Sequence, residues 1–179
     1  MLGLIKGTIK LCEHETMWEE NASQTILLLK QSFGENAVDI QHIGSTAIKR
    51  IKAKPIIDIV VGVSDMTQVK IIISSLERVG IIHRPNNDQP EYMMFIIGDL
   101  SIGLRTHHIH VVPYDGEEWN NQLNFRDFMN EHLKNAKEYE AFKIDLMNLY
   151  KNNRAMYTDS KTPYIMNIFR QAAEWRQHT

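Results

Sequence analysis

Two short runs of branched apolar residues, joined by a basic connection, constrain this chain more than any other feature of its sequence. The runs VDIQHI (38–43) and PIIDIVVGV (55–63) are rich in Val and Ile, as is typical of β-strands. Between them, Gly44, Ser45 and Thr46 open a connection that carries four cations and no acid. The sequence therefore predicts a strand, a tight turn, a helical or coiled crossover and a second strand.

The turn has the residue types of a phosphate-binding site. Gly44 lets the backbone approach a ligand closely, and the hydroxyls and amides of Ser45 and Thr46 would suit an anion at a helix N-terminus. The crossover adds positive charge, which includes that of Lys54. We therefore expect a phosphate group to bind here.

One carboxylate interrupts the second apolar run. Asp58 alternates with Ile56 and Val60, so it is the only charged group on its face of that strand. An acid among apolar residues is costly unless a metal, a base or a backbone amide holds it. Two interpretations stay open: a functional carboxylate, and a structural Asp that pairs with a nearby base or caps a turn.

Size and composition predict one domain spanning residues 1–179, since 43% of the residues are hydrophobic and no linker or repeat divides the chain. The formal net charge of −2 gives no general electrostatic reason to bind nucleic acid or an anionic membrane, so any phosphate recognition must be local. The lone Cys12 cannot form an internal disulfide, and no apolar run reaches the length of about 20 residues that a membrane span needs. We therefore expect a cytoplasmic protein.

Hydrophobic spacing predicts helices and strands on both sides of this region. The expected helices cover 13–33, 67–79, 119–133 and 141–150, and a last helix starts from Tyr157. The helix over 119–133 could break near Asn124. One short strand is expected to start at Ile81, and two further strands cover 92–97 and 101–113. Strands and helices thus alternate before a helical final third.

Two histidines share one face of the expected strand 101–113. His108, His110 and Val112 alternate on that face, while His107, Ile109 and Val111 lie on the other. Two imidazoles on one strand face are close enough to share a metal or a phosphate. Histidines at a strand edge are also commonly inert, so both interpretations stay open.

Five motifs occur in an order that resembles the GrpB family, also called UPF0157. They are HIGST (42–46), AKPIIDI (53–59), HHIHVV (107–112), FRDFM (125–129) and YT (157–158) with Lys161. The resemblance implies an α+β fold similar to polymerase-β-type nucleotidyltransferases: a small mixed sheet flanked by helices, with a helical C-terminal third. One departure is the loop after HIGST, which commonly reads like Val-Pro-Gly in the family and is AIKRIK here.

The resemblance also implies a divalent metal (Mg²⁺, Mn²⁺ or Zn²⁺) as cofactor. In that superfamily an acid-x-acid strand follows the Gly-Ser turn and holds two Mg²⁺ ions, but here Val60 stands in the place of the second acid. His108 and His110 stand where a third acid is expected. With Asp58 they would form a two-histidine, one-carboxylate site that suits Zn²⁺, Mn²⁺ or Fe²⁺ better than Mg²⁺.

The first functional hypothesis is a nucleotidyltransferase-like enzyme that acts on a nucleotide or another phosphate-bearing small molecule. Asp58, His108 and His110 would be catalytic and would bind the metal. The expected substrate-binding residues are His42, Gly44, Ser45, Thr46, Lys54, Arg105, Arg126, Lys143 and Lys161. The alternative, favoured by Val60, is an inactive module that binds a nucleotide or coenzyme. A histidine-triad hydrolase ranks last, because Val112 replaces a required histidine.

Overall fold

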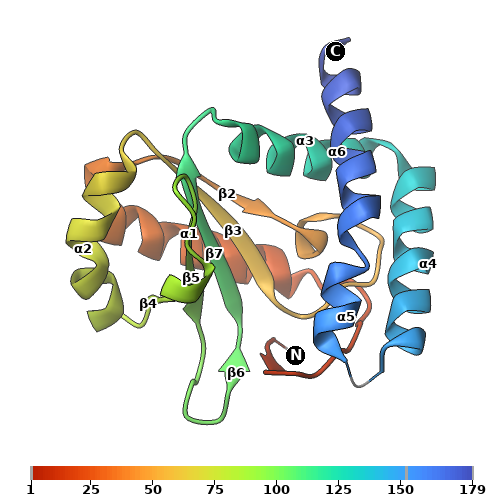
Figure 1. Cartoon of the computed structure of the whole chain (residues 1–179), viewed down its shortest axis with the longest axis horizontal. Helices are drawn as coiled ribbons and strands as arrows, with labels where there is room; N and C mark the ends of the chain where they lie inside the picture. The colour runs from red at the N-terminus through yellow and green to blue at the C-terminus, as the bar shows by residue number, and fades with distance from the viewer. Residues whose placement is uncertain (1, 152, 179) are drawn as a thin grey trace.

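The chain folds into a mixed β-sheet with helices against both faces (Figure 1). A computed structural model describes residues 2–151 and 153–178. The strands are β1 (Leu4–Ile5), β2 (Ala37–Ile43), β3 (Ile57–Val63), β4 (Ile82–His83), β5 (Met93–Ile97), β6 (Leu104–Arg105) and β7 (His107–Pro113). The α-helices are α1 (Met17–Phe33), α2 (Met66–Arg78), α3 (Glu117–Glu131), α4 (Leu133–Leu149), α5 (Arg154–Asp159) and α6 (Thr162–Arg176), with short 3₁₀ helices η1 (Gly34–Asn36), η2 (Ser45–Ala47) and η3 (Pro85–Asn87). The protein is therefore of the mixed α+β class.

The main sheet has the strand order β2-β3-β7-β5-β4. Strands β3 and β7 are parallel, and the other neighbours are antiparallel. The parallel register sets Asp58 opposite His108, and Val60 opposite His110. Because alternate residues share a strand face, these four side chains project from the same face of the sheet.

The two faces of the sheet are covered unequally. Helices α1 and α2 close one face over a core that includes Ile59, Val61, Ile109 and Val111. On the other face, α3 covers one end of the strands, where Trp119 packs on Ile43, Val60 and Val112. Helices α4 and α6 pack with α3 around a separate apolar cluster. A pocket lined by Asp58 and His108 occupies the part of this face that α3 leaves uncovered.

The end of α1 and the start of α2 follow local signals in the sequence. Helix α1 ends before Gly34, whose φ of +56° suits glycine. The side chain of Asp65 accepts a hydrogen bond from the Thr67 amide and caps α2. One difference is that α1 starts at Met17 rather than at Glu13.

Four predicted elements differ from the structure. The strand predicted over 101–113 is two strands, because β6 pairs with the unpredicted β1 while β7 joins the main sheet. Helix α3 continues through Asn124 without a break, and α4 begins at Leu133 rather than at Ala141. The last predicted helix is divided into α5 and α6, with Pro163 in the first turn of α6. No helix in the described part of the chain is both long enough and apolar enough to cross a membrane.

Candidate functional site

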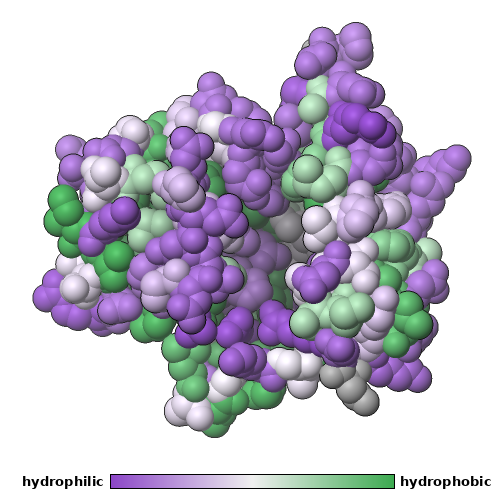
Figure 2. All heavy atoms as spheres, in the orientation of Figure 1, coloured by the Kyte–Doolittle hydropathy of each residue, from purple (hydrophilic) through white to green (hydrophobic). Residues whose placement is uncertain are grey.

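A pocket of about 410 Å³ opens on the exposed part of the sheet, and we call it the basic pocket. Figure 2 shows hydrophilic side chains lining a hollow between the sheet and the C-terminal helices. Asp58, His108 and His110 line the pocket from β3 and β7. Its six cationic residues are Lys54, Arg84, Arg105, Lys143, Arg154 and Lys161. Among the described residues that line it, Asp58 is the only acid.

The Asp58 carboxylate meets both histidines. His108 Nδ1 donates a hydrogen bond to Asp58 Oδ1 at 3.1 Å, and His110 Nε2 lies 3.8 Å from the same oxygen. Burial alone would raise the pKa of the Asp58 carboxyl, but the hydrogen bonds and charge of the two histidines lower it well below its usual range. Asp58 is therefore an ionised carboxylate at neutral pH. The other ring nitrogen of His110, Nδ1, points away from Asp58 and lies 2.7 Å from the Tyr92 hydroxyl.

The three lysines of the pocket lie close to one another, with Lys143 buried and Lys54 and Lys161 half-buried. Burial, followed by repulsion from Lys161, lowers the pKa of Lys54 to about 7 and that of Lys143 to about 7. The Nζ atoms of Lys54 and Lys161 lie 4.1 and 5.2 Å from the centre of the Tyr157 ring, which both approach as cation–π partners. Within residues 2–151 and 153–178, no acid lies within ion-pair distance of these three lysines. A bound anion would supply the missing opposite charge.

The Gly44 turn packs directly behind Asp58. A Cβ atom at Gly44 would lie 2.5 Å from Asp58 Oδ2, and the φ of +70° also favours glycine. Ser45 lines the basic pocket, and its hydroxyl donates to the Tyr139 hydroxyl at 3.4 Å. The turn continues only into the three-residue η2, so it does not present the N-terminus of a longer helix as the sequence suggested.

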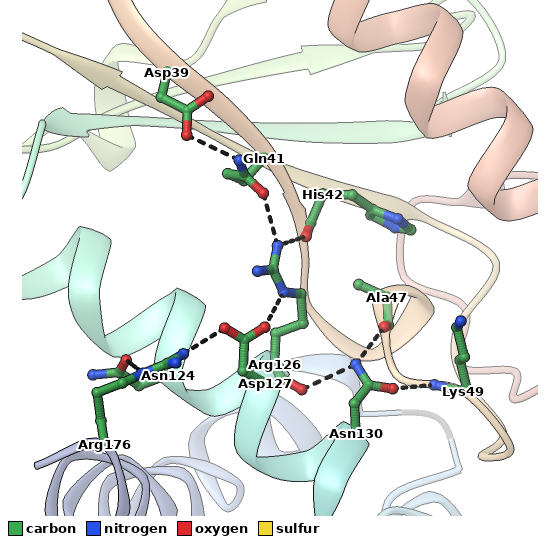
Figure 3. A network of polar contacts seen from close by, with 10 residues as sticks. All are labelled: Asp39, Gln41, His42, Ala47, Lys49, Asn124, Arg126, Asp127, Asn130 and Arg176. Carbon is green, nitrogen blue, oxygen red and sulfur yellow. Dashed lines mark hydrogen bonds and ion pairs between the residues drawn. The ribbon is translucent and has the colours of Figure 1, made fainter. Parts of the chain in front are cut away.

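Three predicted ligand-binding residues lie away from the basic pocket, namely His42, the buried Thr46 and Arg126. His42 projects from the opposite face of β2, where its Nε2 lies 3.0 Å from the buried Thr46 hydroxyl. Arg126 donates from Nη1 to Gln41 Oε1 and to the His42 carbonyl oxygen, each at 3.0 Å (Figure 3). Its Nε also donates to Asp127. Arg126 therefore joins α3 to β2 instead of reaching a ligand at Asp58.

Sequence reasoning missed several residues that line the pocket, notably Arg84, Arg154 and Tyr157, whose ring Lys54 and Lys161 approach. Arg84 begins a loop rich in Pro and Asn, for which the sequence favours a solvated connection over contact with a substrate, and Arg154 precedes the expected start of the last helix. Tyr157 appeared in the YT motif without an assigned role. No local signal shows that these positions approach Lys54, because the tertiary fold brings them together.

As arranged, the Asp58 centre does not fit a divalent metal site. The described residues contain no group of three or more His, Cys, Asp or Glu side chains placed to hold a metal ion. The histidine nitrogens nearest the carboxylate face Asp58 itself, and Val60, in the place of a second acid, is fully buried. Metal binding stays a prediction, and no chemical step below depends on it.

Fold and pocket together define an α+β protein with a five-stranded mixed sheet and one strongly basic cleft on its open face. A family model described as "GrpB protein" matches residues 8–171, and the chain belongs to this family.

Relatives match along most of the chain. The "Glutamate-rich protein GrpB" of Alkalihalophilus pseudofirmus is 38% identical over 96% of this chain and 99% of its own length. A UPF0157 protein of Pseudomonas aeruginosa is 28% identical over 95% of this chain and 70% of its own. The crystal structure of conserved protein GrpB from Enterococcus faecalis superposes with a TM-score of 0.86 at 27% identity, covering 94% of this chain and 99% of that one.

Proposed function

We propose that this protein is nucleotidyltransferase-like and binds a nucleotide or another phosphate-bearing small molecule in the basic pocket. The observation that carries the proposal is the convergence of six cationic side chains on a pocket in which Asp58, the only acid among the described lining residues, is already engaged by His108. Such a pocket favours a ligand with several negative charges over one with a single charge. A chain of phosphates has this property.

The order of elements supports the nucleotidyltransferase-like part of the proposal. Strand β2, the Gly44 turn and β3 with Asp58 follow one another, and β7 then lies beside β3. This is the order that the family resemblance implies for the phosphate turn, the acidic strand and the later strand of the site. The resemblance in fold says nothing by itself about turnover.

For transfer, we assign proton acceptance to His108. Its Nδ1–H is held by Asp58, and its Nε2 is buried without a hydrogen-bond partner among the described residues. An unpaired buried nitrogen is costly, and a substrate hydroxyl would satisfy it. In the step, the acceptor oxygen forms a bond to phosphorus, the bond from phosphorus to the leaving phosphate oxygen breaks, and the acceptor proton passes to Nε2. The pocket cations stabilise the charge of the leaving phosphate.

A second candidate function is binding without turnover. It is favoured by Val60, which fills the place of a second acid and lies beneath Trp119. Both candidates require the basic pocket, and only the first requires His108. The variant His108→Gln should therefore keep nucleotide affinity and lose pyrophosphate release if the protein is an enzyme, whereas absence of release from the unaltered protein across nucleoside triphosphates favours the second.

Calorimetric titration with ATP and with pyrophosphate tests the binding site. Each of the variants Lys54→Gln and Lys161→Gln should bind at least about tenfold more weakly, because each removes one charge-assisted contact. Lys49→Gln is the matched control, since Lys49 is exposed and does not line the basic pocket. Equal affinities for all four proteins would show that phosphate binds elsewhere.

A further inference from the structure

A second cavity adjoins the basic pocket, and we propose that it binds the acceptor of the transferred group, a hydroxyl-bearing small molecule with positive charge. This inference rests on the proposed function and extends it from the phosphate-bearing substrate to the second substrate. Most of the residues that line the second cavity lie outside the basic pocket.

The second cavity has a volume of about 860 Å³ and shares two wall residues, Asn87 and His110, with the basic pocket. It lies between the loop that precedes β5, the first turns of α3 and the side of α6. Tyr92 lines the wall formed by the loop before β5, Glu118 the wall formed by α3, and Phe169 the wall formed by α6. A molecule in this cavity would therefore touch the same histidine as a ligand in the basic pocket.

The shared wall connects the cavity to the Asp58 centre. The Tyr92 hydroxyl lies 2.7 Å from His110 Nδ1, and His110 Nε2 faces Asp58 at 3.8 Å. Group transfer requires the acceptor oxygen to reach the phosphorus while the leaving phosphate stays bound, so the two substrates must meet at one wall. His110 lies at that place, and the centre of its ring is 6.5 Å from that of His108, the assigned proton acceptor in the adjoining basic pocket.

The charge of the second cavity is opposite to that of the basic pocket. Its lining contains three glutamates and no lysine or arginine among the described residues, whereas the basic pocket has six cations and one acid. Glu117 and Glu118 also stabilise the N-terminus of α3, but Glu91 lies on the opposite wall and has no such role. The three carboxylates would repel an anionic acceptor and attract a cationic one.

The remaining lining fits a molecule with several hydroxyl groups. The side-chain amides of Asn87, Gln89, Asn121 and Gln122 offer donors and acceptors, and Phe169 offers an aromatic face for carbon-bound hydrogens. Gln122 donates to Glu118 Oε1 at 2.7 Å, which holds this carboxylate in place and leaves its other oxygen for a ligand. The lining thus suits a polyhydroxylated ring that carries an ammonium group.

Saturation-transfer NMR with three sugars of matched size tests the proposal. The probes are glucosamine, glucose and glucuronate at pH 6.5, each added to protein saturated with ATP. We expect the strongest transfer to glucosamine, weaker transfer to glucose and none to glucuronate. In the double variant Glu91→Gln, Glu118→Gln, glucosamine binding should weaken at least threefold, while Glu77→Gln, a surface change on α2, should have no effect.

The outcomes separate this inference from the proposed function, because ATP affinity is measured in the same samples. Retained ATP binding without glucosamine binding, or with glucuronate binding equally well, would overturn the acceptor site and leave the phosphate site intact. Unchanged glucosamine binding in the double variant would overturn it as well. If the unaltered protein did not bind ATP, the proposed function would be overturned instead.

Discussion

At the scale of single residues, the charge of the basic pocket depends on pH in the physiological range. The pKa values of Lys54 and Lys143 are about 7 because both ammonium groups are buried near other cations. A bound anion favours their protonated forms, so binding requires proton uptake above pH 7. Affinity should therefore be greatest below pH 7 and should decrease as pH rises through these pKa values.

Sulfate tests this prediction, because its charge does not change over the range used. Its affinity, measured by calorimetry, should decrease at least about tenfold between pH 6 and pH 8.5, as expected for one group of pKa near 7 that is protonated in the complex. The variant Lys54→Gln should bind more weakly and show a smaller dependence on pH. An affinity that stays constant over this range would contradict the assignment.

His42 gives a separate prediction about stability in acid. Burial is the main cause that lowers its pKa to about 4; Asp58 and Glu19 act in the opposite direction, while Arg126 and His14 lower the pKa further. The unfolded chain then binds one proton more than the folded chain between pH 6.5 and pH 4. The stability contributed by neutral His42 is complete above pH 6.5 and is lost as pH decreases toward 4, with a slope of up to about 1.4 kcal/mol per pH unit.

The variant His42→Gln removes this titration and can keep a hydrogen bond to Thr46. Urea denaturation at pH 7.5 and pH 4.5 should show a smaller loss of stability in the variant than in the unaltered protein. Part of the loss should remain, since burial also lowers the pKa of His107 to about 4. Identical losses of stability in both proteins would show that the titration of His42 does not cause the loss of stability in acid.

Residue types alone suggested Asp58 because an unpaired acid in an apolar strand is costly, and alternation along one strand placed His108 and His110 together. Arg126 shows where such reasoning fails. Its charge was compatible with a phosphate, but its guanidinium satisfies Gln41 and the His42 carbonyl oxygen instead. A sequence motif records that a cation is present and does not record which acceptor it meets.

At the scale of elements, the turn between β2 and β3 positions the carboxylate. Gly44→Ala should lower the free energy of unfolding by about 2–4 kcal/mol, because it combines a positive φ with a collision against Asp58. Gly80→Ala is the matched control: it has a φ of +84° but no atom within 4 Å of the added Cβ. It should cost only the backbone term of about 1–2 kcal/mol.

Binding separates the two glycine variants further. Gly44→Ala should weaken ATP binding, since the displaced Asp58 carboxylate would disturb the lining of the basic pocket, while Gly80→Ala should leave the affinity unchanged. Chemical denaturation and calorimetry measure the two effects. Equal destabilisation of both variants, with unaltered ATP affinity, would show that the turn does not hold the carboxylate in place.

Helix α3 explains why a second acid is absent from β3. Val60 shares the face of Asp58, but Trp119 covers it, and its exposed fraction is 0%. Val60→Asp should lower stability by about 3–5 kcal/mol, because it buries a charge without a partner. Val60→Thr should cost less. Denaturation curves measure these losses, and a stable Val60→Asp protein that binds Mn²⁺ would show instead that the position can open to the pocket.

The strand predicted over 101–113 shows how far periodicity alone reaches. Its alternation correctly separated His108 and His110 from the core residues Ile109 and Val111, but it could not show that Thr106 divides two strands. The division arises because Leu104 and Arg105 pair with the two-residue β1 near the N-terminus. A two-residue strand has no hydrophobic period, so its partner could not be predicted.

At the scale of the whole molecule, the basic pocket is assembled from two sides. Lys54, Arg84 and Arg105 come from the sheet and its connections. Lys143 and Arg154 come from α4 and α5, and Lys161 from the turn between α5 and α6. The mixed sheet and the helical final third were predictable from spacing and resemblance. Their joint cleft was not, because it depends on how the cluster of α3, α4 and α6 packs beside β2 and β3.

This assembly predicts that a polyanion stabilises the molecule as a unit. Without ligand, like charges repel across the cleft, and a bound anion replaces that repulsion with attraction to both sides. Tripolyphosphate at 100 times its Kd should add about 2.7 kcal/mol to the free energy of unfolding and raise Tm by about 5–10 °C.

Lys161→Gln should raise Tm without ligand and reduce the tripolyphosphate shift, because the same change relieves repulsion in the free protein and removes a contact to the ligand. Thermal denaturation at constant ionic strength measures both effects, with Lys49→Gln as the charge-matched control. If Lys161→Gln destabilised the free protein and kept the full ligand shift, Lys161 would stabilise the fold and the polyanion would bind outside the cleft.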